Sequence, residues 1–232
     1  MKIYAFADEA NNMIDGQIEA MKTTGIDGLE VRGVDNVNIS DISIAKAREV
    51  KKKMDDAGLK VWSIGSPIGK IDIVKGSFET EVERLRRTLE TAAVLGAENI
   101  RLFSFYFPKD ANKADYKNEV IERLGIFLEH AKGTGITLCH ENEKGIYGDV
   151  PERCLEIHKA LPEMKAIFDP ANYIQCGVNT LAAWGSRGVL AMLAESTNVE
   201  RPGYTMSERK IGDTFHNLFK DAKGRIIIAM FA

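Results

Sequence analysis

Short runs of apolar and β-branched residues alternate along this chain with longer segments in which apolar residues recur at helical spacing. Strands are expected at six of these runs, residues 3–6, 28–31, 60–64, 99–103, 136–140 and 166–168. Helices are expected in the gaps between them. The alternation is typical of βα units around a parallel sheet, so it limits the possible folds more than any single residue does.

The predicted helices share a stop signal. In residues 44–57, the side chains of Ile44, Ala47, Val50 and Met54 fall on one face, and Gly58 follows as a C-terminal glycine. Residues 79–95 lead to Gly96, and residues 118–131 lead to Gly133. A glycine before each new strand indicates that the same βα unit is repeated.

The last quarter of the chain offers two more strands. Residues 188–193 read GVLAML and residues 225–231 read RIIIAMF, with a helix expected at 207–222 that opens on Ser207. Eight strands in 232 residues predict an α/β fold of the (β/α)8 TIM-barrel-like type. A doubly wound open sheet remains the alternative, because strand counting does not separate the two.

Composition and charge narrow the classes of function. The 31 Lys and Arg against 34 Asp and Glu give a net charge of -3, which argues against nucleic acid as a partner. No apolar run reaches the roughly 20 residues of a membrane span, and the first residues lack a signal-peptide core, so a cytoplasmic protein without membrane contact is expected. The three cysteines match no CxxC spacing, which favours reduced thiols.

Polar residues follow the predicted strands, where a barrel carries its chemistry. The fifth and sixth strands are the most informative, because ITLCHENE places Glu141 at one strand end and AIFDPAN places Asp169 at the next. Carboxylates from neighbouring strand ends can share a hard divalent cation. Glu141 and Asp169 are therefore the candidate metal ligands.

Plainer explanations exist for the same residues. Glu141 at a strand end can be a solvated loop residue, and Asp169 before a proline can open a turn. His140 can be a hydrogen-bonded core residue. Glu30 can be a buried ion-pair partner of Arg32 or Arg101.

Six motifs occur together and in order: YAFADE, GLEVRG, IGSPIGK, IRLFSFY, HENEKGIYGD and FDPANY. Over residues 1–184 the chain resembles the sugar phosphate isomerase/epimerase family, which has the xylose isomerase-like TIM-barrel fold. The resemblance implies that Glu141 and Asp169 are two of four ligands to Mn²⁺, Mg²⁺, Co²⁺ or Zn²⁺. It also implies proton removal next to a sugar carbonyl, with Glu141 as a catalytic base.

The same resemblance implies a small sugar or sugar phosphate as the partner, and makes a homodimer conceivable. The candidate substrate-binding residues are the polar side chains on or near the strand ends: Glu30, Arg32, Lys70, Arg101, His140, Asn142 and Asn172.

The resemblance stops after Trp184. The family's other two ligands, a His in a motif like HIKD and a Glu on the eighth strand, are missing. Residues 187–232 instead resemble a fragment of the ribonuclease J group of metallo-β-lactamase-fold nucleases, with Glu195 where that group has a metal-bridging Asp. The HxHxDH motif of those nucleases is absent from this chain.

Two parts of the chain are therefore distinguished, a barrel portion at 1–184 and a ribonuclease J-like tail at 185–232. A fusion, a deliberate chimera and simple drift within the isomerase family are the three explanations. The tail is expected to pack as the last two strands of the same domain, with Glu195 as a candidate third metal ligand.

The leading functional hypothesis is an isomerase/epimerase whose activity is impaired or lost because two ligands are missing. The alternative is a non-catalytic binding or scaffold protein that keeps the barrel pocket. Nuclease activity is the third hypothesis, and the acidic composition argues against it.

Overall fold

The computed structural model describes residues 3–178, 192–194 and 228–230. Its main sheet has six parallel strands in the order β1-β2-β5-β6-β7-β8. These strands are Tyr4–Ala5, Gly28–Val31, Lys60–Gly65, Asn99–Leu102, Thr137–Glu141 and Lys165–Ile167. Neighbours in the sheet follow one another along the chain apart from the small hairpin β3–β4, which is the order of a TIM-barrel-like fold.

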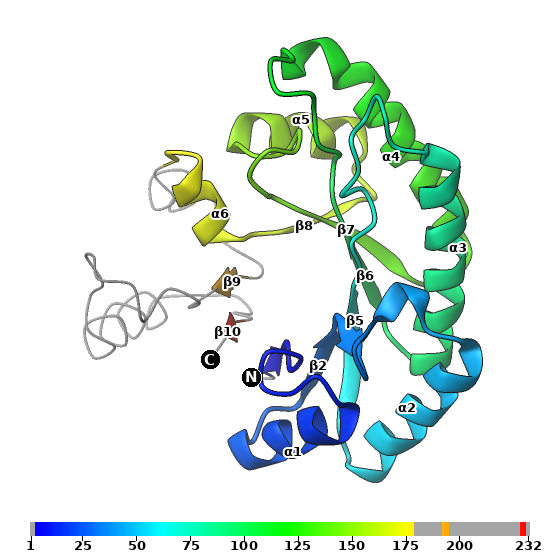
Figure 1. Ribbon diagram of the computed structural model, residues 1–232. Coiled ribbons are helices and arrows are strands. Elements are labelled where there is room, and N and C mark those ends of the chain that lie inside the picture. Colours follow the sequence, from blue (N-terminus) through cyan, green and yellow to red (C-terminus); the bar gives the residue numbers. More distant parts are fainter. Residues whose placement is uncertain (1–2, 179–191, 195–227, 231–232) are drawn as a thin grey trace.

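Helices cover the outer side of the curved sheet (Figure 1). The α-helices α1 to α6 are Ile14–Thr24, Ile44–Asp56, Phe78–Leu95, Lys117–Ala131, Pro151–Ala160 and Pro170–Gln175. Two 3-10 turns lie at Ile39–Asp41 and Lys113–Tyr116. Each helix lies between successive strands, as the alternating sequence pattern predicts.

The core lies between the sheet and these helices. Ile64, Ile100 and Leu102 are fully buried, and the helices contribute residues such as Leu85 and Leu124. Buried parallel strands consist of nearly continuous apolar runs, and this explains why the sequence pattern predicts these strands.

The expected helix stops are confirmed. Gly58 and Gly96 adopt left-handed backbone angles, with φ of 70° and 72°; Gly96 directly follows α3, and Gly58 follows α2 after one intervening residue, Ala57. Gly133, with φ of 78°, follows two residues after α4. At the opposite helix ends, the Ser43 and Ser77 hydroxyls accept hydrogen bonds from the backbone N–H groups of Lys46 and Thr80.

A small hairpin, which sequence reasoning missed, follows β2. Its strands β3 and β4, Gly33–Val34 and Val37–Asn38, pair antiparallel across Asp35 and Asn36. Both turn residues have positive φ, 50° and 66°. Asn and Asp tolerate this conformation better than other non-glycine residues, so they suit a tight hairpin turn.

Two short strands in the tail pair with each other in parallel. They are β9, Met192–Ala194, which overlaps the expected run 188–193 and ends one residue beyond it, and β10, Ile228–Met230, which lies within the expected run 225–231. In Figure 1 they lie on the open side of the sheet, with β9 near α6 and β10 near β1. Neither joins the six-stranded ladder, so closure of the barrel by these strands stays a prediction. The helix expected at 207–222 and Glu195 lie outside the described residues.

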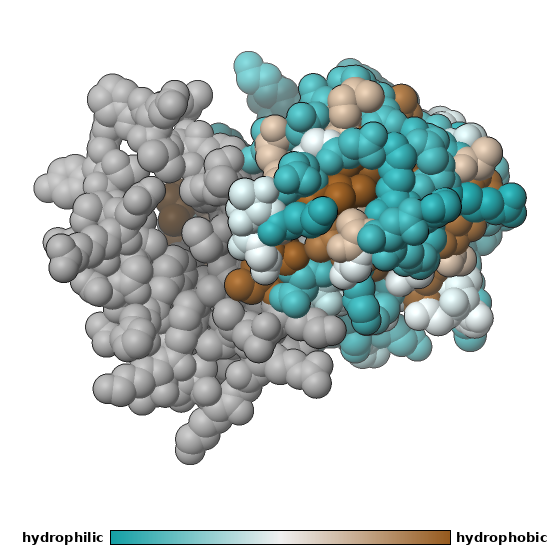
Figure 2. All heavy atoms as spheres, turned by 90° about the horizontal axis from the view of Figure 1, so that it is seen from below, coloured by the Kyte–Doolittle hydropathy of each residue, from teal (hydrophilic) through white to brown (hydrophobic). Residues whose placement is uncertain are grey.

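The outer surface carries many charged side chains. Figure 2 shows a mainly hydrophilic face with smaller hydrophobic areas between. On α2, exposed pairs such as Lys51–Asp55 and Lys52–Asp56 are spaced four residues apart. Across the part of the chain that the structure describes, no helix has the length and apolar character to cross a membrane.

Candidate functional site

The register of the sheet puts three charged side chains on one face. Glu30 on β2 is level with Ser63 on β5, and Arg101 on β6 is level with Gly65 on β5 and Cys139 on β7. Residues two apart on a strand share a face, so Glu141 faces the same way as Cys139. Glu30, Arg101 and Glu141 therefore meet on the inner side of the sheet.

These three residues form a buried charge cluster, named here the triad. Arg101 Nη1 lies 3.0 Å from Glu141 Oε2, and Arg101 Nε lies 3.4 Å from Glu30 Oε1. Exposed fractions are 4% for Glu30, 8% for Arg101 and 5% for Glu141. Glu30 Oε1, Arg101 Nε and Glu141 Oε2 make no hydrogen bond of acceptable geometry, so the triad is held by charge more than by directed bonds.

Gly65 makes this contact possible. Strand β5 lies between β2 and β6, so Arg101 must reach across it to approach Glu30. A Cβ at position 65 would lie 2.6 Å from Arg32 Cγ, 3.0 Å from Glu30 Oε1 and 3.2 Å from Arg101 Nη2. The absent side chain thus leaves the space in which the three polar groups converge.

Burial makes ionisation of both carboxylates harder. It raises the pKa of Glu30 to about 7, against the lowering effect of Arg101. Burial also raises the pKa of Glu141, again opposed by the guanidinium of Arg101. Arg101 is one cation between two buried carboxyl groups, and it opposes the rise in pKa at both of them.

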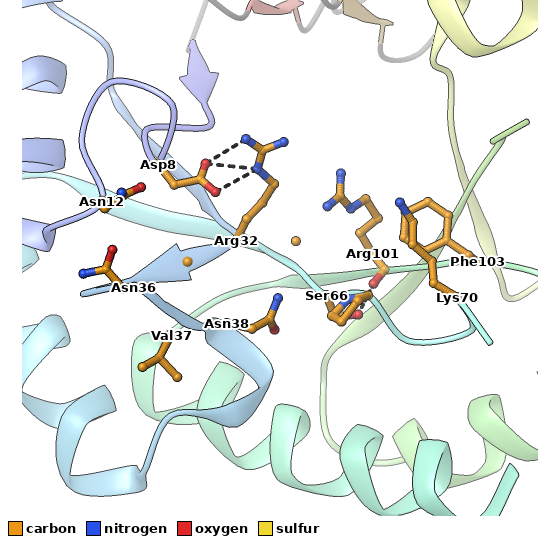
Figure 3. Close-up of a pocket in the computed structure, with 13 residues that line it drawn as sticks. Asp8, Asn12, Arg32, Asn36, Val37, Asn38, Ser66, Lys70, Arg101 and Phe103 are labelled. Carbon is orange, nitrogen blue, oxygen red and sulfur yellow. Dashed lines mark hydrogen bonds and ion pairs between the residues drawn. The ribbon is translucent and has the colours of Figure 1, made fainter. Parts of the chain in front are cut away.

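A polar cavity of about 500 Å³ opens beside the triad (Figure 3). Its walls come from loops after β1, β2, β5 and β6 and from the hairpin β3–β4. The lining residues are Asp8, Asn12, Arg32, Gly33, Asn36, Val37, Asn38, Gly65, Ser66, Pro67, Lys70, Arg101 and Phe103. The mixture of amides, charged groups and one aromatic ring can bind a small molecule with several hydroxyl groups.

The other two cations of the cavity are also paired. Arg32 bonds to Asp8, as Figure 3 shows, and to Glu9 at 2.7 Å. Lys70 Nζ lies 2.6 Å from Glu143 Oε2, and the Tyr106 hydroxyl donates to Glu143 Oε1.

Aromatic rings lie between these cations. Arg32 lies 4.4 Å and Arg101 5.0 Å from the Phe6 ring centroid. Lys70 lies 4.2 Å and Arg101 5.4 Å from the Phe103 ring centroid. Rings at these distances stabilise the cations and fix their positions across the cavity.

Asp169 is buried, and it caps a helix. Its Oδ1 accepts a hydrogen bond from the backbone N–H of Asn172 at 3.0 Å, which is the N-cap of α6. The Asn172 side chain donates to Asp169 Oδ2 at 2.9 Å. The Asn142 side chain exchanges two hydrogen bonds of 2.7 Å with the backbone of Asp169, which ties the end of β7 to the end of β8.

His140 lies on the opposite face from Glu141, among the helices. It is 1% exposed, and its Nε2 is 2.9 Å from the Ser104 hydroxyl. Burial lowers the pKa of His140 to about 3, with a further contribution from His158. This surrounding is that of a hydrogen-bonded core histidine, one of the two explanations that the sequence left open.

The described residues do not by themselves fit a resident divalent metal ion. No three His, Cys, Asp or Glu side chains within residues 3–178 come together as a metal-binding group. Of the two predicted ligands, Glu141 is paired with Arg101 and Asp169 is bonded to Asn172.

The structure places the predicted substrate contacts in two groups. Arg32, Lys70 and Arg101 line the cavity. Four others are not among the lining residues of the described chain: Glu30, His140, Asn142 and Asn172. Glu30 instead forms an ion pair with Arg101, and the two asparagines form hydrogen bonds with Asp169.

Sequence reasoning missed the amide side chains of the cavity, Asn12, Asn36 and Asn38. The signal that could have found two of them is the sequence GVDNVN, in which Asp-Asn separates Gly-Val from Val-Asn. That pattern predicts a tight hairpin, and a hairpin after a barrel strand reaches the mouth of the barrel.

Comparison with known families agrees with this architecture. A family model described as "Xylose isomerase-like TIM barrel" matches residues 18–223, and the chain belongs to this family. The matched region extends beyond Trp184, where the resemblance of the motifs to sugar isomerases ends.

Solved structures of similar fold include a 3-keto-D-glucoside 4-epimerase from E. coli in its apo form. It has a TM-score of 0.71 and 16% identity, and the match covers 100% of this chain and 93% of that one. The IOLI protein with a bound zinc atom has a TM-score of 0.73 and 13% identity, over 99% and 88% of the two chains. At such identities the likeness concerns the fold alone.

A second similarity covers a smaller part of the chain. Ribonuclease J2 of Bacillus subtilis (strain 168) is 41% identical over 63 residues, which is 27% of this chain and 11% of the nuclease. The chain thus matches about a tenth of the length of this relative.

Proposed function

We propose that the protein binds a small, uncharged sugar in its polar cavity and transfers a proton at Glu141, as an isomerase or epimerase of lowered activity. The observation that carries the proposal is the cavity of about 500 Å³ at the carboxyl ends of the strands, with Arg101 linking it to the buried carboxylate of Glu141. Membership of the xylose isomerase-like family supports the class of reaction.

The charges of the cavity favour a free sugar over a sugar phosphate. Arg32, Lys70 and Arg101 are each within 3.4 Å of a carboxylate. The carboxylates paired with them are Asp8, Glu9, Glu30, Glu141 and Glu143, which outnumber the three cations. A phosphate would have to break these pairs and would meet uncompensated negative charge.

Glu141 is suited to proton transfer because burial raises its pKa and thereby strengthens it as a base. Arg101 holds the carboxylate in position and can also bind an oxygen of the substrate that gains negative charge. The lowered activity follows from the absence of the family's other two ligands, the His in a motif like HIKD and the Glu on the eighth strand, of which Glu195 would replace one at most. A divalent ion, Mn²⁺, Mg²⁺, Co²⁺ or Zn²⁺, would have Glu141, Asp169 and the proposed third ligand Glu195 as its ligands, and we propose that it binds weakly.

A matched pair of ligands tests the substrate class. D-Fructose and D-fructose 6-phosphate differ only by the phosphate, and isothermal titration calorimetry measures the affinity of each. We expect the phosphate ester to bind at least tenfold more weakly. Asn12→Leu should weaken fructose binding about fivefold, the value of one hydrogen bond. Asn118→Leu on the exposed face of α4 should not change it, and equal effects of both variants would contradict a sugar site in this cavity.

Deuterium incorporation tests the reaction. If Glu141 removes a proton next to the carbonyl, fructose or tagatose incubated with the protein in D₂O will gain deuterium at that carbon, which NMR detects. Glu141→Gln should abolish the exchange.

The ion pair of Glu141 with Arg101 favours a second candidate, a non-catalytic binding protein, because a paired carboxylate is a poorer base. That candidate predicts fructose binding with no deuterium incorporation. We also propose that residues 185–232 are a fused or chimeric segment that completes the barrel. Glu195→Ala tests its role as a metal ligand, since an unchanged metal affinity would remove it from the ligand set.

A further inference from the structure

We propose that Arg101 competes with divalent metal ions for Glu141, so that its guanidinium takes the charge-balancing place that a metal ion would hold. This competition involves the metal ion alone and does not require a bound sugar.

The competition follows from the position of one oxygen atom. Glu141 Oε2 lies 3.0 Å from Arg101 Nη1 and has no hydrogen-bond partner of acceptable geometry. Divalent cations bind carboxylate oxygens at roughly 2.0–2.6 Å, so an ion on this oxygen would lie within roughly 6 Å of the guanidinium. Two positive charges this close repel strongly at a buried site. Tight metal binding therefore requires that Arg101 moves away.

Arg101 has a place to move to. It lines the cavity, and its guanidinium already lies 5.0 Å from the ring centroid of Phe6 and 5.4 Å from that of Phe103. Movement into the cavity keeps a ring contact while it uncovers Glu141. Gly65 leaves this path open, because a Cβ there would come within 3.2 Å of Arg101 Nη2.

A second cation of the cavity provides a matched control. Arg32 has the same charge and side chain, lines the same cavity, and forms its ion pairs with Asp8 and Glu9. Arg32→Met and Arg101→Met therefore remove one positive charge each from the same region. They differ in whether the ion pair with Glu141 is lost.

The experiment is a titration with Mn²⁺ alone, in which isothermal titration calorimetry measures the affinity. We expect Arg101→Met to raise the Mn²⁺ affinity at least tenfold over the unmodified protein, and Arg32→Met to change it less than threefold. The gain should disappear in the double variant Arg101→Met, Glu141→Gln. An unchanged affinity in Arg101→Met, an equal gain in Arg32→Met, or a gain that survives the loss of Glu141 would each overturn the proposal.

Two further measurements keep the test decisive if Arg101→Met does not fold. Arg101→Lys retains the charge but lacks the planar guanidinium that contacts both Glu30 and Glu141. The Mn²⁺ affinity of this variant should therefore rise about threefold, and no rise would contradict the competition. In the unmodified protein, the Nε–H NMR signal of Arg101 should shift as Zn²⁺ is added, and this shift should be absent in Glu141→Gln. Zn²⁺ binding through Glu141 that leaves the Arg101 signal in place would refute the proposal.

Discussion

The end of β7 and the corner between β8 and α6 both place a buried carboxylate at the same edge of the sheet, but they hold it in different ways. Glu141 at the end of β7 is paired with a buried guanidinium, 3.0 Å from Arg101. Asp169 at the corner accepts hydrogen bonds from the backbone and side chain of Asn172. The first carboxylate is balanced by charge, and the second by helix capping.

The difference has a structural origin. Strands β5, β6 and β7 lie inside the sheet, where charged residues on the inner face meet one another and must be neutralised. Strand β8 lies at the edge of the six-stranded sheet, and its residues Lys165 and Ala166 are exposed. Two acidic residues at equivalent strand ends therefore need not serve the same function, and their partners distinguish them.

The largest expected effect comes from removing the cation of the triad. Arg101→Met leaves Glu30 and Glu141 buried without the ion-pair partner that they share, which should lower the free energy of unfolding by about 3–5 kcal/mol. Urea denaturation measures it, with exposed Lys165→Met at β8 as a control that should change little. Added Mn²⁺ should restore part of the loss. A cost below about 1 kcal/mol would show that the triad is not what neutralises these carboxylates.

Glu30→Gln tests whether the buried carboxyl group of Glu30 makes the free energy of unfolding depend on pH. The pKa of Glu30 rises from 4.5 to about 7 in the fold, so the folded state binds more protons than the unfolded state between these values. Its contribution to stability is therefore full below pH 4.5 and is lost as the pH rises through 7. The loss is on the order of 3 kcal/mol.

Glu30→Gln should accordingly be the more stable protein at pH 8, and the difference should shrink towards pH 5. Denaturation at the two pH values measures this. Arg101, Glu141 and Arg32 also shift the pKa of Glu30. The same comparison made in an Arg32→Met background shows how much of the pH dependence is due to Arg32. A stability difference that is independent of pH would show that Glu30 is not the titrating group.

Gly65→Ala tests the space in which the triad meets. The added Cβ would approach Arg32 Cγ to 2.6 Å, so we expect a loss of about 1–3 kcal/mol from overpacking. Gly125→Ala on α4 is the matched control, because its nearest atom would be Leu161 Cδ2 at 3.8 Å. That control should be neutral or stabilising by up to about 1 kcal/mol. Equal costs at both sites would remove the special role of Gly65.

The smallest effect is expected at the corner. Asp169→Ala removes the cap of α6 and should cost about 1 kcal/mol, while Asp169→Asn keeps an accepting oxygen and should cost a few tenths. Thermal unfolding compares the two. If Asn were as costly as Ala, the charge of Asp169 would matter and the contrast with Glu141 would fail.

Much of the fold could be predicted from the sequence because buried parallel strands and glycine-ended helices have clear patterns. The expected run 28–31 coincides with β2, and Gly58 and Gly96 end their helices as expected. The hairpin β3–β4 was missed because strands of two residues are too short to show a period.

The candidate site could be predicted residue by residue, though not as an arrangement. Glu30, Arg101 and Glu141 were each identified at or near strand ends, and an ion pair of Glu30 with Arg101 was one of the open explanations. Their contact depends on strand register and on the absence of a side chain at Gly65. A local sequence pattern does not predict how neighbouring strands are aligned. For Asp169, the turn explanation agrees with its hydrogen bond as the N-cap of α6, and its role as a metal ligand stays a prediction.

The most direct test of the account is the metal content of the purified protein, measured by elemental analysis for the unmodified chain and for Glu141→Gln. If Arg101 balances Glu141, both proteins will contain far less than one divalent ion per chain, with no difference between them. Close to one ion per chain in the unmodified protein, lost in Glu141→Gln, would show that Glu141 serves a resident metal and would contradict the account.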